Sequence, residues 1–297
     1  MVCLLLPFLV AASGTTQSAR EKRKVGLLLV NHGSRSVAWR NGLLQLEKNV
    51  RPSALAGGAF SDVRTAFMEY TEPSIATRLK EFDAEGYTDI VLVPVFLTVS
   101  PHSFDDIPTI IGHKDDSHSR EMMRIEKIER YTPRVRVAIT PLLDFTEILE
   151  KNLLRRVKAL SKDSGKEGLV MIAYGDETYD KEWGKLLAKM GESMRKKLGV
   201  SEYAYGWCGH IAHYNPQHTT DAIAKVAAKG KRALVVPVLV AFDETFQLRI
   251  IGGGVSKAKQ AGFDVVYTPD AILPDKDVEQ WVISVARAYS QKITAAK

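Results

Sequence analysis

The stretch VGLLLVNHGS at residues 25–34 decides the fold. Val25–Asn31 reads as a continuous apolar run of strand length, and a His-Gly-Ser turn ends it. A strand that is apolar on both faces is typical of a parallel sheet that helices cover on both sides. The stretch therefore predicts an α/β domain with this strand inside its sheet.

Strands and helices alternate through the rest of the N-terminal half. We expect further strands at Asp62–Phe67, Asp89–Phe96 and Val135–Ile139, and helices at about Val37–Val50, Pro73–Glu85 and Asp144–Leu160. The polar segment Gly112–Arg120 interrupts this order and is predicted to be a mobile surface insertion. Alternation of this kind predicts one parallel sheet between helices.

The second half follows the same order. We expect strands at Leu169–Ala173, Tyr203–Trp207, Ala233–Val240 and Val265–Tyr267, and helices at about Lys181–Leu198, Pro216–Ala228 and Phe246–Ala261. Tyr174 follows its strand as His32 does, 142 positions later, and Pro237 stands 143 positions after Pro94. A nearly constant offset indicates a duplication.

The predicted architecture is therefore a pair of flavodoxin-like parallel-sheet domains. We place the N-terminal domain at residues 24–161 and a degenerate C-terminal repeat at residues 167–294, with a short polar linker between them. Residues 1–19 are predicted to be a signal peptide. Their apolar run Val2–Ala12 is shorter than the roughly 20 residues that a membrane span needs, and small residues follow it. We expect a periplasmic or otherwise exported protein without a membrane span after cleavage; the alternatives for this run are a mis-set start codon or an extra buried strand.

Charge and cysteine content exclude several classes of protein. The formal net charge is +6, with Lys+Arg 41 against Asp+Glu 35, which favours anionic partners. The basic residues are dispersed and not interleaved with aromatic residues, so nucleic acid is not an expected partner. Removal of Cys3 with the signal leaves Cys208 alone, which excludes an internal disulfide and a cysteine-rich metal site.

Two histidines and a glutamate follow strands that should be neighbours. His32 lies just after the first strand, His102 a few residues after the third, and Glu69 after the second. In an open parallel sheet, ligands bind beyond the carboxyl ends of the strands. Imidazole and carboxylate groups suit a borderline divalent ion, and they also accept protons near neutral pH.

The second copy lacks the histidine pair. Tyr174 stands at the position of His32 and Thr245 at that of His102. We therefore expect one active site per chain, with the second domain as a wall. Three histidines of the second copy, His210, His213 and His218, are candidates for a second metal or haem site or for polar residues at the rim.

Three motifs together resemble the sirohydrochlorin cobaltochelatase family, which belongs to the class II tetrapyrrole chelatases. They are Asn31-His32-Gly33-Ser34-Arg35, Glu69-Tyr70-Thr71-Glu72-Pro73-Ser74-Ile75, and Val93-Pro94-Val95-Phe96-Leu97 running on to His102 and Asp105-Asp106-Ile107-Pro108. The resemblance is dense over about residues 25–160 and weaker over 168–290. Asn31 departs from it, because the family's first motif has glycine before the histidine.

The resemblance implies the two-domain chelatase-like fold with an anionic, sirohydrochlorin-like tetrapyrrole in the cleft. It assigns His32 and His102 to the incoming metal and to the loss of pyrrole protons. Glu69 is the best match for a nearby catalytic glutamate, with Glu72 as a possible substitute. The metal substrate would be Co²⁺, or Fe²⁺ or Ni²⁺, and no organic cofactor is expected.

Basic and hydroxyl side chains beside the first motif are the expected substrate-binding residues. Ser34, Arg35 and Arg40 would face the carboxylates of the tetrapyrrole. The alternative function is an exported haem or metal carrier on the same fold. A histidine phosphatase is disfavoured because it needs arginine before the histidine, where this chain has Asn31. An oligomer is compatible with the sequence.

Overall fold

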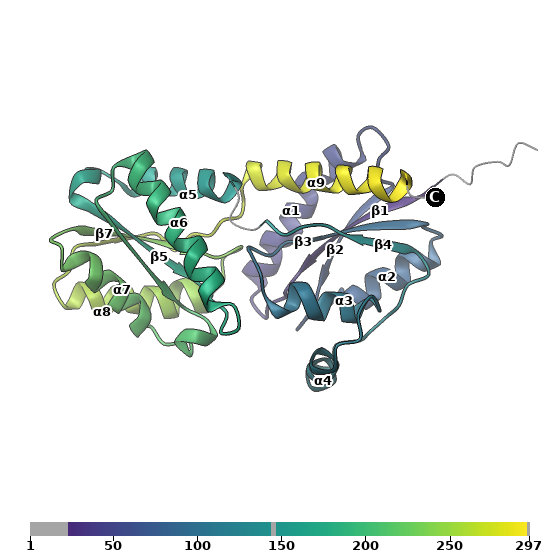
Figure 1. Cartoon of the computed structure of the whole chain (residues 1–297), viewed down its shortest axis with the longest axis horizontal. Coiled ribbons are helices and arrows are strands. Elements are labelled where there is room, and N and C mark those ends of the chain that lie inside the picture. The colour runs from purple at the N-terminus through teal and green to yellow at the C-terminus, as the bar shows by residue number, and fades with distance from the viewer. Residues whose placement is uncertain (1–22, 144–146, 296–297) are drawn as a thin grey trace, which may run out of the picture.

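The computed structural model describes residues 23–143 and 147–295, which form two four-stranded parallel sheets (Figure 1). The first sheet has the order β2-β1-β3-β4 and the second β6-β5-β7-β8. The strands are β1 Val25–Asn31, β2 Asp62–Phe67, β3 Asp89–Pro94, β4 Arg136–Ile139, β5 Glu167–Ala173, β6 Glu202–Trp207, β7 Arg232–Val238 and β8 Val265–Tyr267. The two sheets share one strand order, as the duplication predicts, and the predicted α/β fold class is confirmed.

Helices cover both faces of each sheet. The α-helices are α1 Val37–Leu55, α2 Ile75–Ala84, α3 Ile107–Ile110, α4 Ser117–Glu126, α5 Glu147–Leu160, α6 Asp180–Leu198, α7 Gln217–Ala227, α8 Gly252–Gln260 and α9 Lys276–Ala295. Short helices η1 His102–Asp106, η2 Ser164–Lys166, η3 His210–Ala212 and η4 Glu244–Ile251 complete the connections. Ser36 and Ser74 begin α1 and α2, because each hydroxyl accepts a hydrogen bond from a first-turn amide.

The closing helices of the two halves are exchanged. Figure 1 shows α9 lying along α1 beside the N-terminal sheet, and α5 lying beside the C-terminal sheet. Arg287 of α9 donates to the carbonyl oxygen of Ser53 at 2.6 Å, and Asn152 of α5 donates to that of Ile272 at 3.1 Å. Each sheet is therefore completed by a helix from the other sequence repeat. Helix α9 itself was not among the predicted elements.

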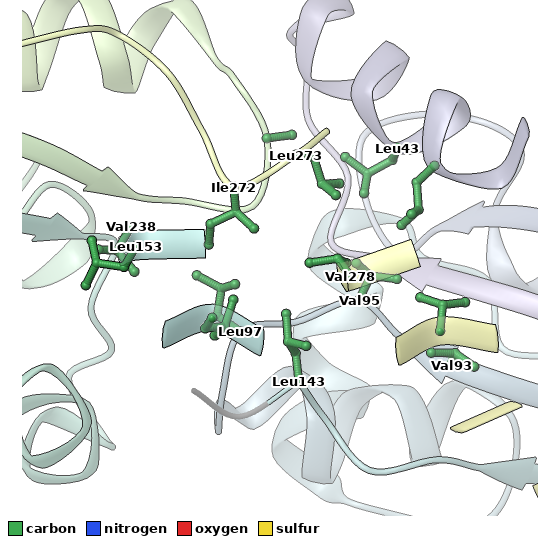
Figure 2. Close-up of a cluster of buried hydrophobic side chains, with 14 of the residues drawn as sticks. Leu43, Val93, Val95, Leu97, Leu143, Leu153, Val238, Ile272, Leu273 and Val278 are labelled. Carbon is green, nitrogen blue, oxygen red and sulfur yellow. The ribbon is translucent and has the colours of Figure 1, made fainter. Parts of the chain in front are cut away.

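One hydrophobic core runs through both domains. It contains β1, β2 and β3 residues such as Leu29 and Val93 together with Leu153 of α5 and Val278 of α9. Figure 2 shows Leu97, Leu143 and Ile272 between the two sheets as part of the same cluster. A continuous close-packed core of this kind fixes the position of one sheet relative to the other, and with it the carboxyl ends of the strands of both sheets.

The inserted segment is more ordered than we predicted. The expectation of a mobile insertion at Gly112–Arg120 is wrong for its second part, because α4 begins at Ser117. Asp116 starts that helix by accepting a hydrogen bond from the Ser119 amide at 2.8 Å. In the first repeat, α4 lies between α3 and β4. The described part of the second repeat has no helix at the corresponding place, between α8 and β8.

The predicted signal peptide at residues 1–19 lies outside the described residues. Within residues 23–143 and 147–295, no helix combines the length and the apolar character that crossing a membrane requires.

Candidate functional site

A tight turn at the end of β1 places His32. Gly33 has φ +104°, and a Cβ atom there would lie 2.1 Å from the carbonyl oxygen of Glu69. Only glycine tolerates both the backbone conformation and this approach. The amide of Glu69 donates to the carbonyl oxygen of His32 at 2.8 Å, so the turn fixes the two residues beside each other.

The short π-helix η1 places His102. The Nδ1 atom of His102 lies 2.7 Å from Oδ2 of Asp106, one turn further on. A carboxylate accepts, so Nδ1 carries the proton and Nε2 keeps its lone pair. The Nδ1 atom of His32 similarly donates to the carbonyl oxygen of Gly33 at 3.1 Å. Both imidazoles therefore offer Nε2 as the free ligand atom.

His32, Glu69 and His102 converge. One ligand atom from each lies within 4.8 Å of those of the other two, and the two imidazole centroids are 4.7 Å apart. Two neutral imidazoles and a carboxylate suit divalent Co, Ni, Fe or Zn. No second group of three such side chains converges within the residues that the structure describes. The structure thus brings together the three catalytic residues predicted from the sequence.

Burial holds the pKa of His32 below its ordinary value. Desolvation is the largest cause, repulsion from His102 adds to it, and the Glu69 carboxylate partly offsets both. His32 is therefore neutral at neutral pH, which is the form that binds a metal.

This lowered pKa makes the stability of the metal-free protein depend on pH. Below the ordinary value of 6.5, unfolded chains bind a proton at His32 and folded chains do not, so stability falls as the pH falls through that window. Below pH 6.5, we expect His32→Gln to reduce the slope of the free energy of unfolding against pH by up to about 1.4 kcal/mol per pH unit. Urea unfolding at several pH values between 7.5 and 5.5 measures this slope. The control is His113→Gln, which changes an exposed histidine. Equal slopes for the parent and His32→Gln would contradict the assignment.

Asp106 supports His102 and was not predicted as a site residue. Burial opposes its ionisation, but hydrogen bonds from His102 and Ser119 outweigh this and hold its pKa below the usual range. The carboxylate thus stays ionised and orients a metal-binding imidazole. The signal in the sequence was the spacing from His102 to Asp106, one helical turn.

We expect Asp106→Asn to lower the affinity for Co²⁺ about ten- to a hundredfold, because the amide makes His102 a weaker ligand. Isothermal titration calorimetry on the metal-free protein measures this. Asp105→Asn is the matched control, since the Asp105 carboxylate pairs with Lys114. Equal affinities for the two variants would show that Asp106 does not act through His102.

Two of the three groups, His32 and His102, line a cleft between the domains with a volume of about 650 Å³, and Glu69 is not among its described lining residues. The N-terminal domain contributes the ends of β1 and β3, and the C-terminal domain contributes the ends of β5 and β7. This volume lies within the range of small-molecule sites. Arg35 lines the cleft, with its guanidinium 5.2 Å from the centroid of the Tyr70 ring.

Two of the predicted substrate-binding residues are engaged within the protein. The hydroxyl of Ser34 donates to Asp243 at 2.8 Å, which ties the two domains together at the cleft. Arg40 is not among the described residues that line the cleft, and its guanidinium donates to the Ser34 carbonyl oxygen at 2.7 Å, so its role toward the substrate stays a prediction. Glu72, the stated substitute for Glu69, is not part of the convergent group, and its carboxylate accepts a hydrogen bond from the amide of Ser74 at the start of α2.

The three histidines of the second repeat do not form one site. His210 lines the cleft, whereas His213 and His218 are absent from its lining. The predicted alternative of a second metal or haem site made by these residues therefore has no geometric support in the described chain.

Fold and site together define a two-domain α/β protein in which two histidines and a glutamate form a candidate divalent-metal site beside the interdomain cleft. Residues 26–160 match the family model described as CbiX. The resemblance predicted from the sequence is thereby confirmed.

Two similar proteins are described as sirohydrochlorin cobaltochelatases. The chain is 36% identical over 92 residues to the sirohydrochlorin cobaltochelatase of Methanocaldococcus jannaschii, covering 31% of this chain and 62% of that one. It is 29% identical to the one of Saccharolobus solfataricus, covering 45% and 93%. The chain thus spans less than two thirds of the M. jannaschii relative.

Solved structures show the same fold over both domains. The sirohydrochlorin chelatase SirB from Bacillus subtilis subspecies spizizenii, in complex with cobalt, superposes with a TM-score of 0.66 at 19% identity, covering 92% of this chain and 98% of SirB. CbiX, described as the terminal enzyme of sirohaem biosynthesis in denitrifying bacteria, gives 0.53 at 14% identity, covering 92% of this chain and 99% of that one.

Proposed function

We propose that this protein inserts a divalent metal ion, Co²⁺ first of all, into sirohydrochlorin or a closely related tetrapyrrole. The observation that carries the proposal is the convergence of His32, Glu69 and His102, of which both histidines line a cleft of about 650 Å³. The relatives named sirohydrochlorin cobaltochelatase support both the substrate and the metal.

The site is suited to receive the metal and release it again. Two Nε2 atoms and one carboxylate leave coordination positions free for water and then for ring nitrogens. Two of the four ring nitrogens carry a hydrogen, and the other two bind the metal through an existing lone pair. As each N–H nitrogen binds the metal, its N–H bonding pair becomes the donor pair and the proton leaves, so two protons are lost for each metal inserted. Glu69, which lies beside both histidines, is the carboxylate available to accept them in turn.

Donor chemistry sets the choice of metal only loosely. Imidazole and carboxylate ligands serve cobalt, nickel and iron alike, so availability contributes to the choice. Cobalt is our first choice because of the names of the relatives. One solved structure of SirB from B. subtilis contains Fe³⁺, which keeps Fe²⁺ as the second metal to test.

The test is catalytic turnover. Metal-free protein, at a concentration far below that of its substrates, is mixed with sirohydrochlorin and Co²⁺ under anaerobic conditions, and the visible spectrum is followed. We expect insertion well above the protein-free rate over many turnovers. A carrier would instead bind at most one equivalent and stop, and that result would overturn the proposal.

A further inference from the structure

The C-terminal side of the cleft carries four aromatic rings in mutual contact. Tyr174 lies 5.5 Å from His210 and 5.4 Å from Phe246 between ring centroids, and Tyr214 lies 5.5 Å from His210. All four line the same cleft as His32 and His102. We call Tyr174, His210, Tyr214 and Phe246 the aromatic wall.

Hydrogen bonds fix the rings of this wall. The hydroxyl of Tyr214 lies 3.2 Å from that of Tyr174 and 3.2 Å from Nε2 of His210. Burial raises the pKa of Tyr174, so its phenol stays neutral. A preorganised apolar surface of this kind binds a ligand at a lower cost in entropy than a flexible one.

Tyr214 lines the cleft in a strained backbone conformation. Tyr214 has φ +56° and the preceding His213 has φ +46°, a left-handed conformation that costs stability in residues other than glycine. Tyr214 is nevertheless 45% exposed, so its ring gains little from burial in the metal-free protein. Strained backbone conformations of this kind cluster at functional sites, which makes Tyr214 a candidate ligand-binding residue.

The charged residues that line the cleft are mostly acidic, so their charge does not favour an anion. Arg35 is the one lysine or arginine among its described lining residues, while Glu126, Asp176, Glu177 and Asp243 are acidic. A tetrapyrrole with carboxylate substituents must therefore gain its binding energy elsewhere. Stacking of a conjugated ring on aromatic side chains provides it without a compensating charge.

We propose that the aromatic wall is the docking surface for the flat face of the tetrapyrrole, opposite the face that meets the metal at His32, Glu69 and His102. This inference rests on the proposed function and adds the residues that recognise the macrocycle. One member of the wall, Tyr174, stands where the first repeat has His32.

The test separates macrocycle binding from metal binding. Binding of metal-free sirohydrochlorin is measured by quenching of tryptophan fluorescence, because Trp39 and Trp183 line the cleft. Binding of Co²⁺ alone is measured by calorimetry. We expect Tyr214→Ala and His210→Ala each to raise the Kd for the macrocycle about tenfold and to leave the Kd for Co²⁺ unchanged. Tyr214→Phe should weaken binding less than Tyr214→Ala, because it keeps the stacking ring and loses only the two hydrogen bonds that fix it.

Matched variants exclude a merely structural effect. His213→Ala changes an exposed histidine outside the cleft lining and should bind the macrocycle like the parent. Tyr214→Gly removes the left-handed strain that alanine keeps, so its melting temperature should be at least that of Tyr214→Ala, while its Kd for the macrocycle rises about tenfold as in that variant. In turnover, Tyr214→Ala should raise KM for the macrocycle with a smaller change in kcat.

The outcomes distinguish this inference from the proposed function. Parental insertion activity together with unchanged Kd and KM values in Tyr214→Ala and His210→Ala would overturn the aromatic wall alone. Tyr214-dependent binding of the macrocycle without any insertion of metal would overturn the proposed function and leave the wall standing.

Discussion

Replacing His32 or His102 by alanine should abolish metal binding and metal insertion in a protein that still folds. Each variant removes one of three convergent ligands, so we expect the affinity for Co²⁺ to fall on the order of a hundredfold or more, beyond the loss expected for a supporting residue. Because the ligands act as a unit, the double variant should be scarcely worse than either single one. Calorimetry with Co²⁺ and the insertion assay measure the two effects.

Exposed histidines provide the control for this prediction. His113→Ala removes an imidazole that is distant from the convergent group and should keep the parental affinity and rate. Insertion at the parental rate by His32→Ala or His102→Ala would refute the site. A uniform loss in all three variants would point to damage to the fold instead.

Substituting Val282 by aspartate should unfold the N-terminal domain, although Val282 belongs to the C-terminal sequence repeat. Val282 is fully buried in α9, where it belongs to the core that also contains β1 and β3. An unpaired carboxylate at such a position should lower the free energy of unfolding by about 4 kcal/mol. That is a large part of the stability of an ordinary domain. We expect the metal affinity to be lost with the N-terminal fold, although no ligand has changed.

Gln280→Asp is the matched variant, because it adds the same charge on the exposed side of α9. Its free energy of unfolding, measured by urea titration, should stay within about 0.5 kcal/mol of the parental value. If Val282→Asp destabilised only the C-terminal domain, the exchange of closing helices would not describe the protein in solution.

Much of the site could be predicted from the sequence. The continuous apolar strands specified parallel sheets, and the carboxyl ends of neighbouring parallel strands meet at one edge. His32, Glu69 and His102 therefore had to lie close together once the strand order was known. The roles of Arg40 and Glu72 could not be predicted, because both depend on the hydrogen-bond acceptors that the fold brings to them.

The sequence by itself determined the α/β class, the duplication and the residues of the metal site, since these depend on local periodicity and on positions at strand ends. The tertiary structure decided which sheet each closing helix covers and which histidine of the second repeat enters the cleft. An amphipathic helix such as α9 must bury its apolar face, but nothing in its pattern says against which sheet. That choice is made by the whole core, and the stretch Val25–Asn31, at the centre of the first sheet, is completed by the last helix of the chain.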